Sequence, residues 1–399
     1  MDHRNDSCPS VAVLADDLTS AADGAAPFRR TGHRARILLR DDSSERDESA
    51  AGVTALDLAG RLLDVAEATA RTRRAARTHA GSDLLLKTVD STLRGNIAAE
   101  IRAAYEGSGR RAALIAPAFP AEGRTTVRGV QLVRGVAVHA SEFGRDPVHP
   151  AHCSDLAELL PEAVLVDAGR ADELPAAIDK GGLIVCSAAT DGDLDRIVAA
   201  VDAVDDVLWI GSPGLAAALA ARSARPEAMP VPELVPATRP LVVVGSANPA
   251  ARRQLSNLHA ELGSAGVTVA TGDPGTSVAE LSAADARILT LRTPDERHTP
   301  ATANTLTQHL AEVTRTLVAA GTVDALVLTG GETAAHVLGQ LDVAGIELTD
   351  EPEPGVARGV LLGSRNIPVL IKAGGFGDDD LLLRLCALAA GADRSQGEG

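Results

Sequence analysis

Aromatic side chains and lysines are scarce in this sequence of 399 residues. It has one tryptophan, one tyrosine and four phenylalanines, and three of its 38 basic residues are lysines, namely Lys87, Lys180 and Lys372. So few rings argue against stacking on nucleic-acid bases, and the core must be built from Ala, Val, Leu and Ile. Because arginine serves most generic positive positions, each lysine is a candidate for a specific role.

Cysteines and long apolar runs are scarce too. The four cysteines, Cys8, Cys153, Cys186 and Cys386, form no Cys-x-x-Cys pair, which indicates reduced side chains in a cytosol and no structural zinc. The polar N-terminus lacks the apolar segment of a signal peptide, and no stretch approaches the ~18 apolar residues that span a bilayer. We therefore expect a cytoplasmic protein with no membrane partner.

Positive charge is in deficit, since the net charge is −16. Such a protein repels nucleic acid and anionic membranes at long range, so an anionic small molecule would need a local basic cluster. The 45% hydrophobic and 23% charged composition is that of a globular protein. A length about twice the ~100–200 residues of one domain predicts two domains.

Short β-branched runs alternate with amphipathic stretches, which is typical of parallel α/β sheets. We expect strands at residues 11–15, 36–39, 84–87, 112–116, 163–166, 183–186, 207–210, 241–244, 268–270, 287–290, 325–328 and 369–371. We expect helices at residues 61–80, 96–105, 194–204, 215–223, 251–265, 303–320, 334–340 and 380–389, and a β-hairpin at 130–133 and 136–139.

A proline-rich stretch divides this pattern, with five prolines between residues 226 and 240. Proline favours extended backbone and removes hydrogen-bond donors, as in linkers. We therefore predict two domains, at residues 1–228 and 241–399, joined by a linker at 229–240. The expected fold class is α/β, with two domains that are each a mostly parallel sheet flanked by helices.

Two aspartates, Asp16 and Asp17, follow the first predicted strand. Ligands bind at the carboxyl ends of the strands in open α/β sheets, where these carboxylates could accept a hydroxyl proton or orient Mg²⁺. The alternative is that Thr19 or Ser20 caps the next helix while the aspartates favour its positive end. The residues alone leave both interpretations open.

A denser polar run follows the strand at 84–87. It contains, in order, Lys87, Thr88, Asp90, Ser91, Thr92, Leu93, Arg94, Gly95 and Asn96. Cations suit a carboxylate, and Asp, Ser and Thr suit hydroxyl groups, so the run is typical of a site for a polyhydroxylated acid. A solvated turn is the alternative. It is not a Walker A loop, because the position before the lysine is Leu86 rather than glycine.

The loop at residues 116–129 is rich in proline and glycine and contains Arg124. Arg124 could bind an anion, although the pattern alone indicates only a rigid loop.

Three glycine-rich turns follow predicted strands in the second half: Gly245-Ser246, Gly330-Gly331-Glu332-Thr333 and Lys372-Ala373-Gly374-Gly375. Free backbone N–H groups at a helix N-terminus favour phosphate. Neither the Walker A nor the dinucleotide fingerprint fits, which argues against a nicotinamide-dependent dehydrogenase. The three turns together predict a site for nucleotide phosphates.

In this order, the motifs resemble the four-carbon acid sugar kinase family, which includes 3-oxo-tetronate, D-threonate and D-erythronate kinases. The resemblance runs from about residue 11 to 388 and rests on residues 15–19, 87–96, 117–126, 146–150, 329–333, 353–356 and 372–377. It implies that residues 1–228 form an acid-sugar domain, that residues 241–399 form an ATP domain unlike the P-loop kinases, and that the active-site cleft lies between them. It also implies transfer of the γ-phosphoryl group of ATP to the 4-hydroxyl of a C4 sugar acid.

The resemblance also implies roles for individual residues. Substrate contacts would come from Asp17, Asp90, Ser91, Thr92 and Leu93, with Arg94 beside them, and ATP contacts from Ser246, Gly330, Gly331, Glu332, Thr333 and Gly374. We add Asp16, Arg61, Lys87 and Arg124 to the expected substrate site, and Lys372 and Gly375 to the ATP site.

Two positions depart from the family pattern. Where the family usually has Thr-Asp-Ser-Arg, residues 55–61 keep Asp57 and Arg61 but replace the residues between them, and Gly375 stands where asparagine is common. The first departure leaves the identity of the C4 acid open.

Phosphoryl transfer requires in-line positioning and charge neutralisation. The hypothesis is that Arg61, Lys87 or Arg94 holds the substrate carboxylate and that Asp17 or Asp90 takes the hydroxyl proton. Mg²⁺, Lys372 and the glycine turns would neutralise the phosphates. The other hypothesis is a non-catalytic sugar-acid-binding protein that retains the fold. A homo-oligomer and the metal ligands stay open.

Overall fold

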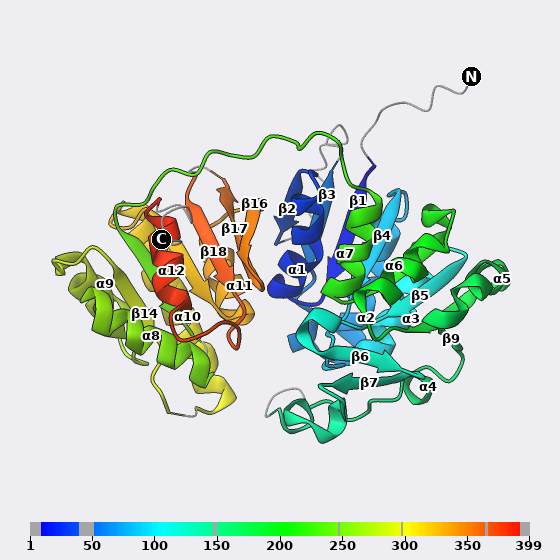
Figure 1. Ribbon diagram of the computed structural model, residues 1–399. Coiled ribbons are helices and arrows are strands. Elements are labelled where there is room, and N and C mark those ends of the chain that lie inside the picture. The colour runs from blue at the N-terminus through cyan, green and yellow to red at the C-terminus, as the bar shows by residue number, and fades with distance from the viewer. Residues whose placement is uncertain are drawn as a thin grey trace, which may run out of the picture. The chain divides into compact units, whose positions relative to one another are not determined.

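The structure is a computed structural model that describes residues 9–39, 52–146, 150–245, 248–296, 298–363 and 366–391. The chain divides into two compact units, Met1–Pro230 and Val231–Gly399 (Figure 1). None of the described helices is long and apolar enough to cross a membrane.

Unit 1 contains an eight-stranded sheet whose neighbouring strands all run parallel. The strand order is β2-β3-β1-β4-β11-β5-β10-β9. Its strands are β1 (Val11–Ala15), β2 (Ala35–Leu38), β3 (Val53–Asp57), β4 (Leu84–Thr88), β5 (Ala112–Ala116), β9 (Val164–Asp167), β10 (Gly182–Ser187) and β11 (Val207–Gly211). β1 and β4 are buried along their whole length, so each is an apolar run that ends at the carboxyl edge of the sheet.

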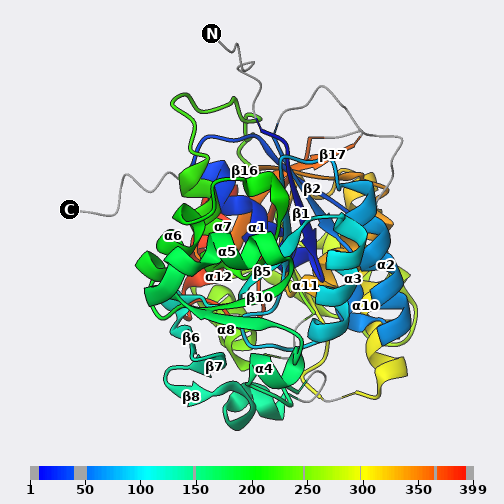
Figure 2. The same ribbon diagram turned by 90° about the vertical axis from the view of Figure 1, so that its right-hand side faces the viewer.

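Helices cover both faces of this sheet. They are α1 (Leu18–Arg30), α2 (Val65–Thr78), α3 (Ile97–Ser108), α4 (Leu156–Leu159), α5 (Leu174–Lys180), α6 (Asp191–Ala199) and α7 (Pro213–Arg222). Figure 2 shows α2 and α3 on one side of β1 and α1, α6 and α7 on the other. Leu14 of β1 belongs to an apolar cluster that the sheet forms with α2 and α3, whereas Val13 packs against Gly24 of α1 on the other face. A Cβ atom on Gly24 would lie 2.7 Å from Val13 Cγ1, so glycine permits this close packing.

A small antiparallel sheet completes unit 1, with β6 (Arg124–Val127), β7 (Val130–Val133) and β8 (Val136–Ala137). The expected hairpin is present, but its second strand is shorter than predicted because a 3₁₀ turn follows at Val138–Ala140. The helix expected at 61–80 begins only at Val65. Arg61 lies instead in a 3₁₀ turn, η2 (Gly60–Leu62).

Unit 2 contains a seven-stranded sheet in the order β13-β14-β12-β15-β18-β17-β16. Its strands are β12 (Pro240–Val244), β13 (Ala265–Thr268), β14 (Leu289–Arg292), β15 (Ala325–Thr329), β16 (Gly345–Glu353), β17 (Val356–Leu362) and β18 (Pro368–Lys372). The first five strands in this order run parallel, and β17 runs antiparallel to both of its neighbours (Figure 1). The two sheets confirm the predicted α/β class with mostly parallel strands.

Five helices flank the sheet of unit 2 among the described residues: α8 (Pro249–Leu262), α9 (Pro274–Ala283), α10 (Pro300–Ala319), α11 (Gly331–Gln340) and α12 (Leu381–Ala389). α8 and α12 share one apolar cluster with β12, β15 and β18. The predictions for unit 2 missed α9 and the β16–β17 pair. They also misplaced two strands. The strand expected at 268–270 is β13 and lies at Ala265–Thr268, and the strand expected at 287–290 is β14 and lies at Leu289–Arg292.

Candidate active site

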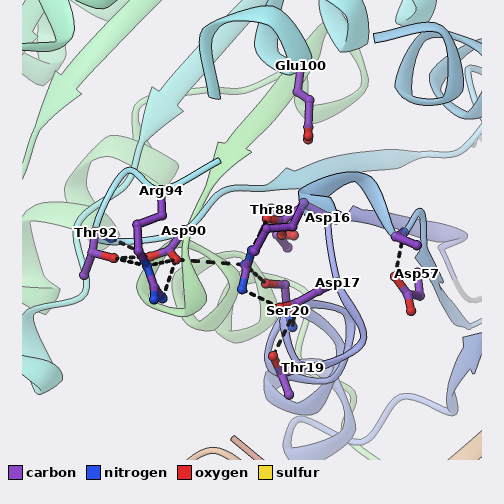
Figure 3. Close-up of polar contacts among 12 residues, drawn as sticks. Asp16, Asp17, Thr19, Ser20, Asp57, Thr88, Asp90, Thr92, Arg94 and Glu100 are labelled. Carbon is purple, nitrogen blue, oxygen red and sulfur yellow. Dashed lines mark hydrogen bonds and ion pairs between the residues drawn. The ribbon is translucent and has the colours of Figure 1, made fainter. Parts of the chain in front are cut away.

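The carboxyl end of β1 places Asp16 and Asp17 at the edge of the sheet in unit 1. Asp17 is the N-cap of α1, and its Oδ1 accepts hydrogen bonds from the Ser20 N–H at 2.7 Å and the Thr19 hydroxyl at 2.9 Å (Figure 3). Thr19 and Ser20 are therefore donors to the cap. The expectation that one of them is the cap is wrong, because the helix begins one residue after Asp17.

Arg61 holds the two aspartates together. Its Nε donates to Asp16 Oδ2 at 2.9 Å, its Nη1 contacts Asp17, and its Nη2 lies 3.9 Å from Asp90 Oδ2. Burial raises the pKa of Asp16, but Arg61 and Lys87 more than offset this effect, so the pKa is lowered. Asp16 is therefore a buried carboxylate, and its Oδ1 has no hydrogen-bond partner among the described residues.

The loop after β4 is organised around Asp90. Its Oδ1 accepts from the Thr92 N–H at 2.7 Å and the Thr92 hydroxyl at 2.6 Å, and its Oδ2 accepts from Arg94 Nε at 2.8 Å (Figure 3). Burial alone would raise the pKa of Asp90, but Arg94, Arg61 and the Thr92 hydrogen bonds lower it to about 2. Leu93 closes the turn with φ of 54°, a left-handed conformation that is uncommon for leucine. The structure thus brings Asp90, Thr92 and Arg94 next to Arg61.

Lys87 is buried beneath this cluster. Its side chain has no exposed surface, and its Nζ lies 2.8 Å from Glu100 Oε2 and donates to the Thr88 carbonyl at 2.8 Å. The positive charge of Lys87 helps to lower the pKa of Asp16, but the Lys87 side chain is not accessible to a ligand in this structure.

Two further carboxyl groups of this edge have a pKa near neutrality. Burial, followed by the charge of Asp17, raises the pKa of Asp23 to about 7. Burial also raises the pKa of Asp57 to about 7, despite a hydrogen bond from the Ala59 N–H, and the charges of Asp17 and Asp16 add to this rise. The sequence analysis did not single out Asp23, because one aspartate inside a helix carries no signal of its surroundings.

The loop after β5 joins the site through Gln131 of β7. The buried Gln131 amide donates to the Ser91 carbonyl at 2.7 Å and the Pro117 carbonyl at 3.3 Å, and it accepts from the Thr126 hydroxyl at 2.6 Å. Arg124 at the start of β6 lies near Phe143, with its guanidinium carbon 5.7 Å from the ring centre. Sequence reasoning missed both Gln131 and Phe143, since neither stands in a conspicuous pattern.

The three glycine-rich turns of unit 2 lie together, because β12, β15 and β18 are neighbours in the sheet. A Cβ atom on Gly245 would collide with the Thr333 side chain, and one on Gly375 would lie 3.1 Å from Asn248 Nδ2. The Gly330 N–H donates to the Lys372 carbonyl at 2.9 Å. The structure therefore groups Gly330, Gly331, Glu332, Thr333, Lys372, Gly374 and Gly375 at one edge. Ser246 lies outside the described residues.

Lys372 is fully buried at this edge. Its Nζ donates to the Ala373 carbonyl at 2.9 Å and the Gly374 carbonyl at 3.3 Å, and no carboxylate among the described residues pairs with it. Burial lowers the pKa of Lys372 to about 8. Gln254 of α8 fixes the same loop by donating to the carbonyls of Phe376, Gly377 and Asp378 at 2.8–3.1 Å. Sequence reasoning missed Gln254 as well.

A cavity of about 690 Å³ lies along α8 and the ends of β13 and β14. Its lining includes Pro249, Arg252, Ser256, Thr268, Arg292 and Asp295. The described residues contain no group of three or more His, Cys, Asp and Glu side chains that could hold a metal ion.

The sheet edge of unit 1 thus carries carboxylates and arginines, and the sheet edge of unit 2 carries glycine turns and a buried lysine. A family model for a sugar-binding N-terminal domain matches residues 11–219, and one for a nucleotide-binding C-terminal domain matches residues 241–382. The chain is 34% identical to a D-threonate kinase of Bordetella bronchiseptica, over 94% of this chain and 96% of the relative. It is 33% identical to a D-threonate kinase of Cupriavidus necator, with the same two coverages. The chain belongs to the four-carbon acid sugar kinase family, which confirms the resemblance, and it is a phosphotransferase that acts on a hydroxyl group.

Solved structures support the fold. A Salmonella typhimurium LT2 protein, 19% identical, matches with a TM-score of 0.78 over 94% of this chain and 98% of that one. A Haemophilus influenzae protein, 20% identical, matches with a TM-score of 0.70 over 92% of this chain and 97% of that one. Both likenesses concern the fold alone.

Proposed function

We propose that the protein transfers the γ-phosphoryl group of ATP to the 4-hydroxyl of a four-carbon sugar acid in carbohydrate catabolism, and that D-threonate is the preferred acid. The observation that carries the proposal is the cluster of the buried Asp16 and Asp90 with the partly buried Asp17 and Arg61 at the carboxyl edge of unit 1. The relatives that are at least 30% identical are D-threonate kinases, which supports this choice of acid.

The hydroxyl groups of the acid are proposed to bind at Asp17, Ser91 and Thr92, with Asp17 as the acceptor of the reacting proton. A general base needs a lone pair within reach of the proton that it takes. Asp90 fits this role poorly, because Thr92 and Arg94 of its own loop donate hydrogen bonds to its two oxygens. Asp17 uses Oδ1 to cap α1, and its Oδ2 contacts Arg61, which the substrate hydroxyl is proposed to displace. Asp90 therefore serves to position Arg94 and Thr92.

ATP is proposed to bind at the glycine turns of unit 2, with its phosphates at the N-terminus of α11 and beside Lys372. No side chain caps this helix, so its first N–H groups are available to an anion. The cavity of about 690 Å³ along α8 is proposed to take the nucleoside. Mg²⁺ commonly binds through substrate phosphates and waters.

A coupled ADP-release assay tests the activity with D-threonate, D-erythronate, L-threonate and 3-oxo-tetronates. We expect Mg²⁺-dependent ADP release that is fastest with D-threonate and absent without an acid. Selectivity for another C4 acid would overturn the choice of D-threonate. Silence with every acid would overturn the kinase activity and favour the non-catalytic alternative.

We also propose that the protein acts in the cytoplasm, where ATP is available, and that it forms a homodimer. A Bordetella bronchiseptica relative, 33% identical with a TM-score of 0.51, crystallised as a domain-swapped dimer with bound citrate. Light scattering of the purified protein tests the dimer, and a monomer mass at assay concentrations would contradict it.

A further inference from the structure

The cations of the predicted substrate site differ in how well the protein compensates their charge. Three of the four have carboxylate partners at hydrogen-bond distance: Arg61 with Asp16 and Asp17, Lys87 with Glu100, and Arg94 with Asp90 and Asp146. A bound carboxylate would have to compete with these internal partners. None of the three is therefore an open site for another anion.

Arg124 differs from these cations. Its side chain is 12% exposed, and its one carboxylate contact among the described residues is Glu122, at a long 3.7 Å. Its Nε is buried without a hydrogen-bond partner in the same part of the chain. Burial lowers the pKa of Arg124, and Glu122 and Asp90 offset this only in part. The protein thus holds a nearly buried guanidinium with little compensation.

The surroundings of Arg124 place it beside the acid-binding loop. Phe119 N–H and carbonyl groups pair with the Arg124 backbone at 2.7 and 3.0 Å, so the start of β6 is fixed. The guanidinium carbons of Arg124 and Arg94 lie 5.7 and 5.3 Å from the centre of the Phe143 ring. Phe143 therefore orients two guanidinium groups through its ring face, one compensated by Asp90 and one not.

We propose that Arg124 binds the carboxylate of the sugar acid, with Arg94 at its flank, and that Arg61 is a positioning residue for Asp16 and Asp17. A guanidinium fork matches the planar carboxylate through two parallel hydrogen bonds. The carboxylate of the acid would then compensate the charge of Arg124, which the protein's own carboxylates compensate only weakly. This assignment rests on the proposed function for the identity of the acid, but it assigns the carboxylate site separately from catalysis.

Calorimetric titration without ATP tests the assignment with D-threonate and with its neutral primary amide, D-threonamide. Arg124→Gln is expected to weaken D-threonate binding about tenfold to hundredfold, because a charge-assisted pair is lost, and to change D-threonamide binding little. Arg124→Lys should recover part of the affinity for the acid. Arg134→Gln is the matched control, since Arg134 is 75% exposed on the neighbouring turn, and it should bind both ligands normally.

Thermal unfolding separates a binding role from a structural one. Arg124→Gln should keep or raise the melting temperature, because it removes a poorly compensated buried charge. Arg61→Gln should lower the melting temperature, because it leaves Asp16 and Asp17 together without their cation. An Arg124→Gln protein that binds D-threonate normally would overturn the proposal. A protein that melts early and loses acid and amide equally would also overturn it.

The kinase activity and the carboxylate site can fail separately. If no acid stimulates ADP release but D-threonate binding depends on Arg124, the carboxylate site stands and the proposed function fails. If Arg124→Gln keeps the wild-type KM for D-threonate in the ADP-release assay, the function stands and the carboxylate assignment fails.

Discussion

At the scale of single residues, Asp17 and Asp90 have the same side chain but different surroundings. Asp90 accepts hydrogen bonds at both oxygens and has a pKa of about 2, whereas Asp17 caps α1 through one oxygen and contacts Arg61 through the other. A substrate hydroxyl could replace Arg61 at Asp17 without disturbing the loop after β4. At Asp90 it would have to replace hydrogen bonds that hold this loop together. The two aspartates should therefore respond differently to the loss of one oxygen.

Asp17→Asn is expected to lower kcat about 10²-fold or more, as for the loss of a general base, with a smaller change in KM. Asp90→Asn should mainly raise KM and lower stability, since Arg94 and Arg61 lose their shared carboxylate. Steady-state kinetics and thermal unfolding of both variants measure these effects. Asp64→Asn is the control, because Asp64 caps the exposed start of α2 in the same way. If both site variants keep near-normal kcat, neither aspartate is the base.

Lys372 gives a prediction about pH. Its pKa of about 8 in the folded protein lies below the 10.5 of an ordinary lysine. The buried ammonium therefore lowers stability most below pH 8, and the free energy of unfolding should rise from this group between about pH 8 and 10.5. Bound phosphates would raise the pKa of Lys372 again, so ATP binding above pH 8 should take up a proton and become weaker.

Titration calorimetry with ATP between pH 7.5 and about 9.5, in two buffers of different ionisation heat, detects this proton. Lys372→Met should weaken ATP binding at pH 7.5, remove the proton uptake and raise stability at that pH. Lys180→Met is the matched control, because Lys180 is exposed at the end of α5. Proton uptake that persists in Lys372→Met would assign it to another group.

At the scale of elements, the sequence predicts the regular parts of the fold and the turns that follow them. The apolar runs of β1, β4, β12, β15 and β18 are visible because both of their sides are buried, and the polar motifs stand at their carboxyl ends. The β16–β17 pair was missed because β16 contains four acidic residues among nine. The buried state of Lys87 was missed because its partner Glu100 lies on α3, thirteen residues along the chain, which a local motif does not show.

Contacts between elements were the other part that the sequence did not indicate. Gln131 of β7 connects the loops after β4 and β5, and only the folded sheet brings those loops together. Gln254 does the same for the last glycine loop of unit 2. A glutamine gives no signal in a local motif, since its role depends on carbonyl groups that are distant in the chain.

Gln131→Leu tests whether the loops after β4 and β5 depend on the Gln131 side chain. The Ser91 carbonyl and the Thr126 hydroxyl lose their partner in a buried place, so we expect a loss of about 1–3 kcal/mol in the free energy of unfolding. The affinity for the acid should fall as well, since Ser91 belongs to the proposed acid site, while ATP affinity should not change. Urea unfolding and the two titrations measure this. Equal losses of acid and ATP affinity would show a general defect instead of a local one.

At the scale of the whole molecule, each unit has an apolar core of its own. The cluster under α2 and α3 draws its residues from unit 1 alone, and the cluster around α8 and α12 draws its residues from unit 2 alone. Chains with more than one core need not unfold in one step. Since the acid and ATP are proposed to bind to different units, each ligand should stabilise a different part of the chain.

Differential scanning calorimetry of the full chain is therefore expected to resolve two transitions, of which D-threonate shifts one and Mg·ATP the other. At about 100 times the Kd, linkage adds about 2.7 kcal/mol to the unit that binds the ligand, which is a shift of about 5–10 °C. Arg124→Gln should abolish the shift by the acid and Lys372→Met the shift by ATP, while each variant retains the other response. The contrary result would be a single transition whose temperature both ligands raise in the wild-type protein. If either variant then removed the response to both ligands, separate binding would be contradicted and the two units would respond as one.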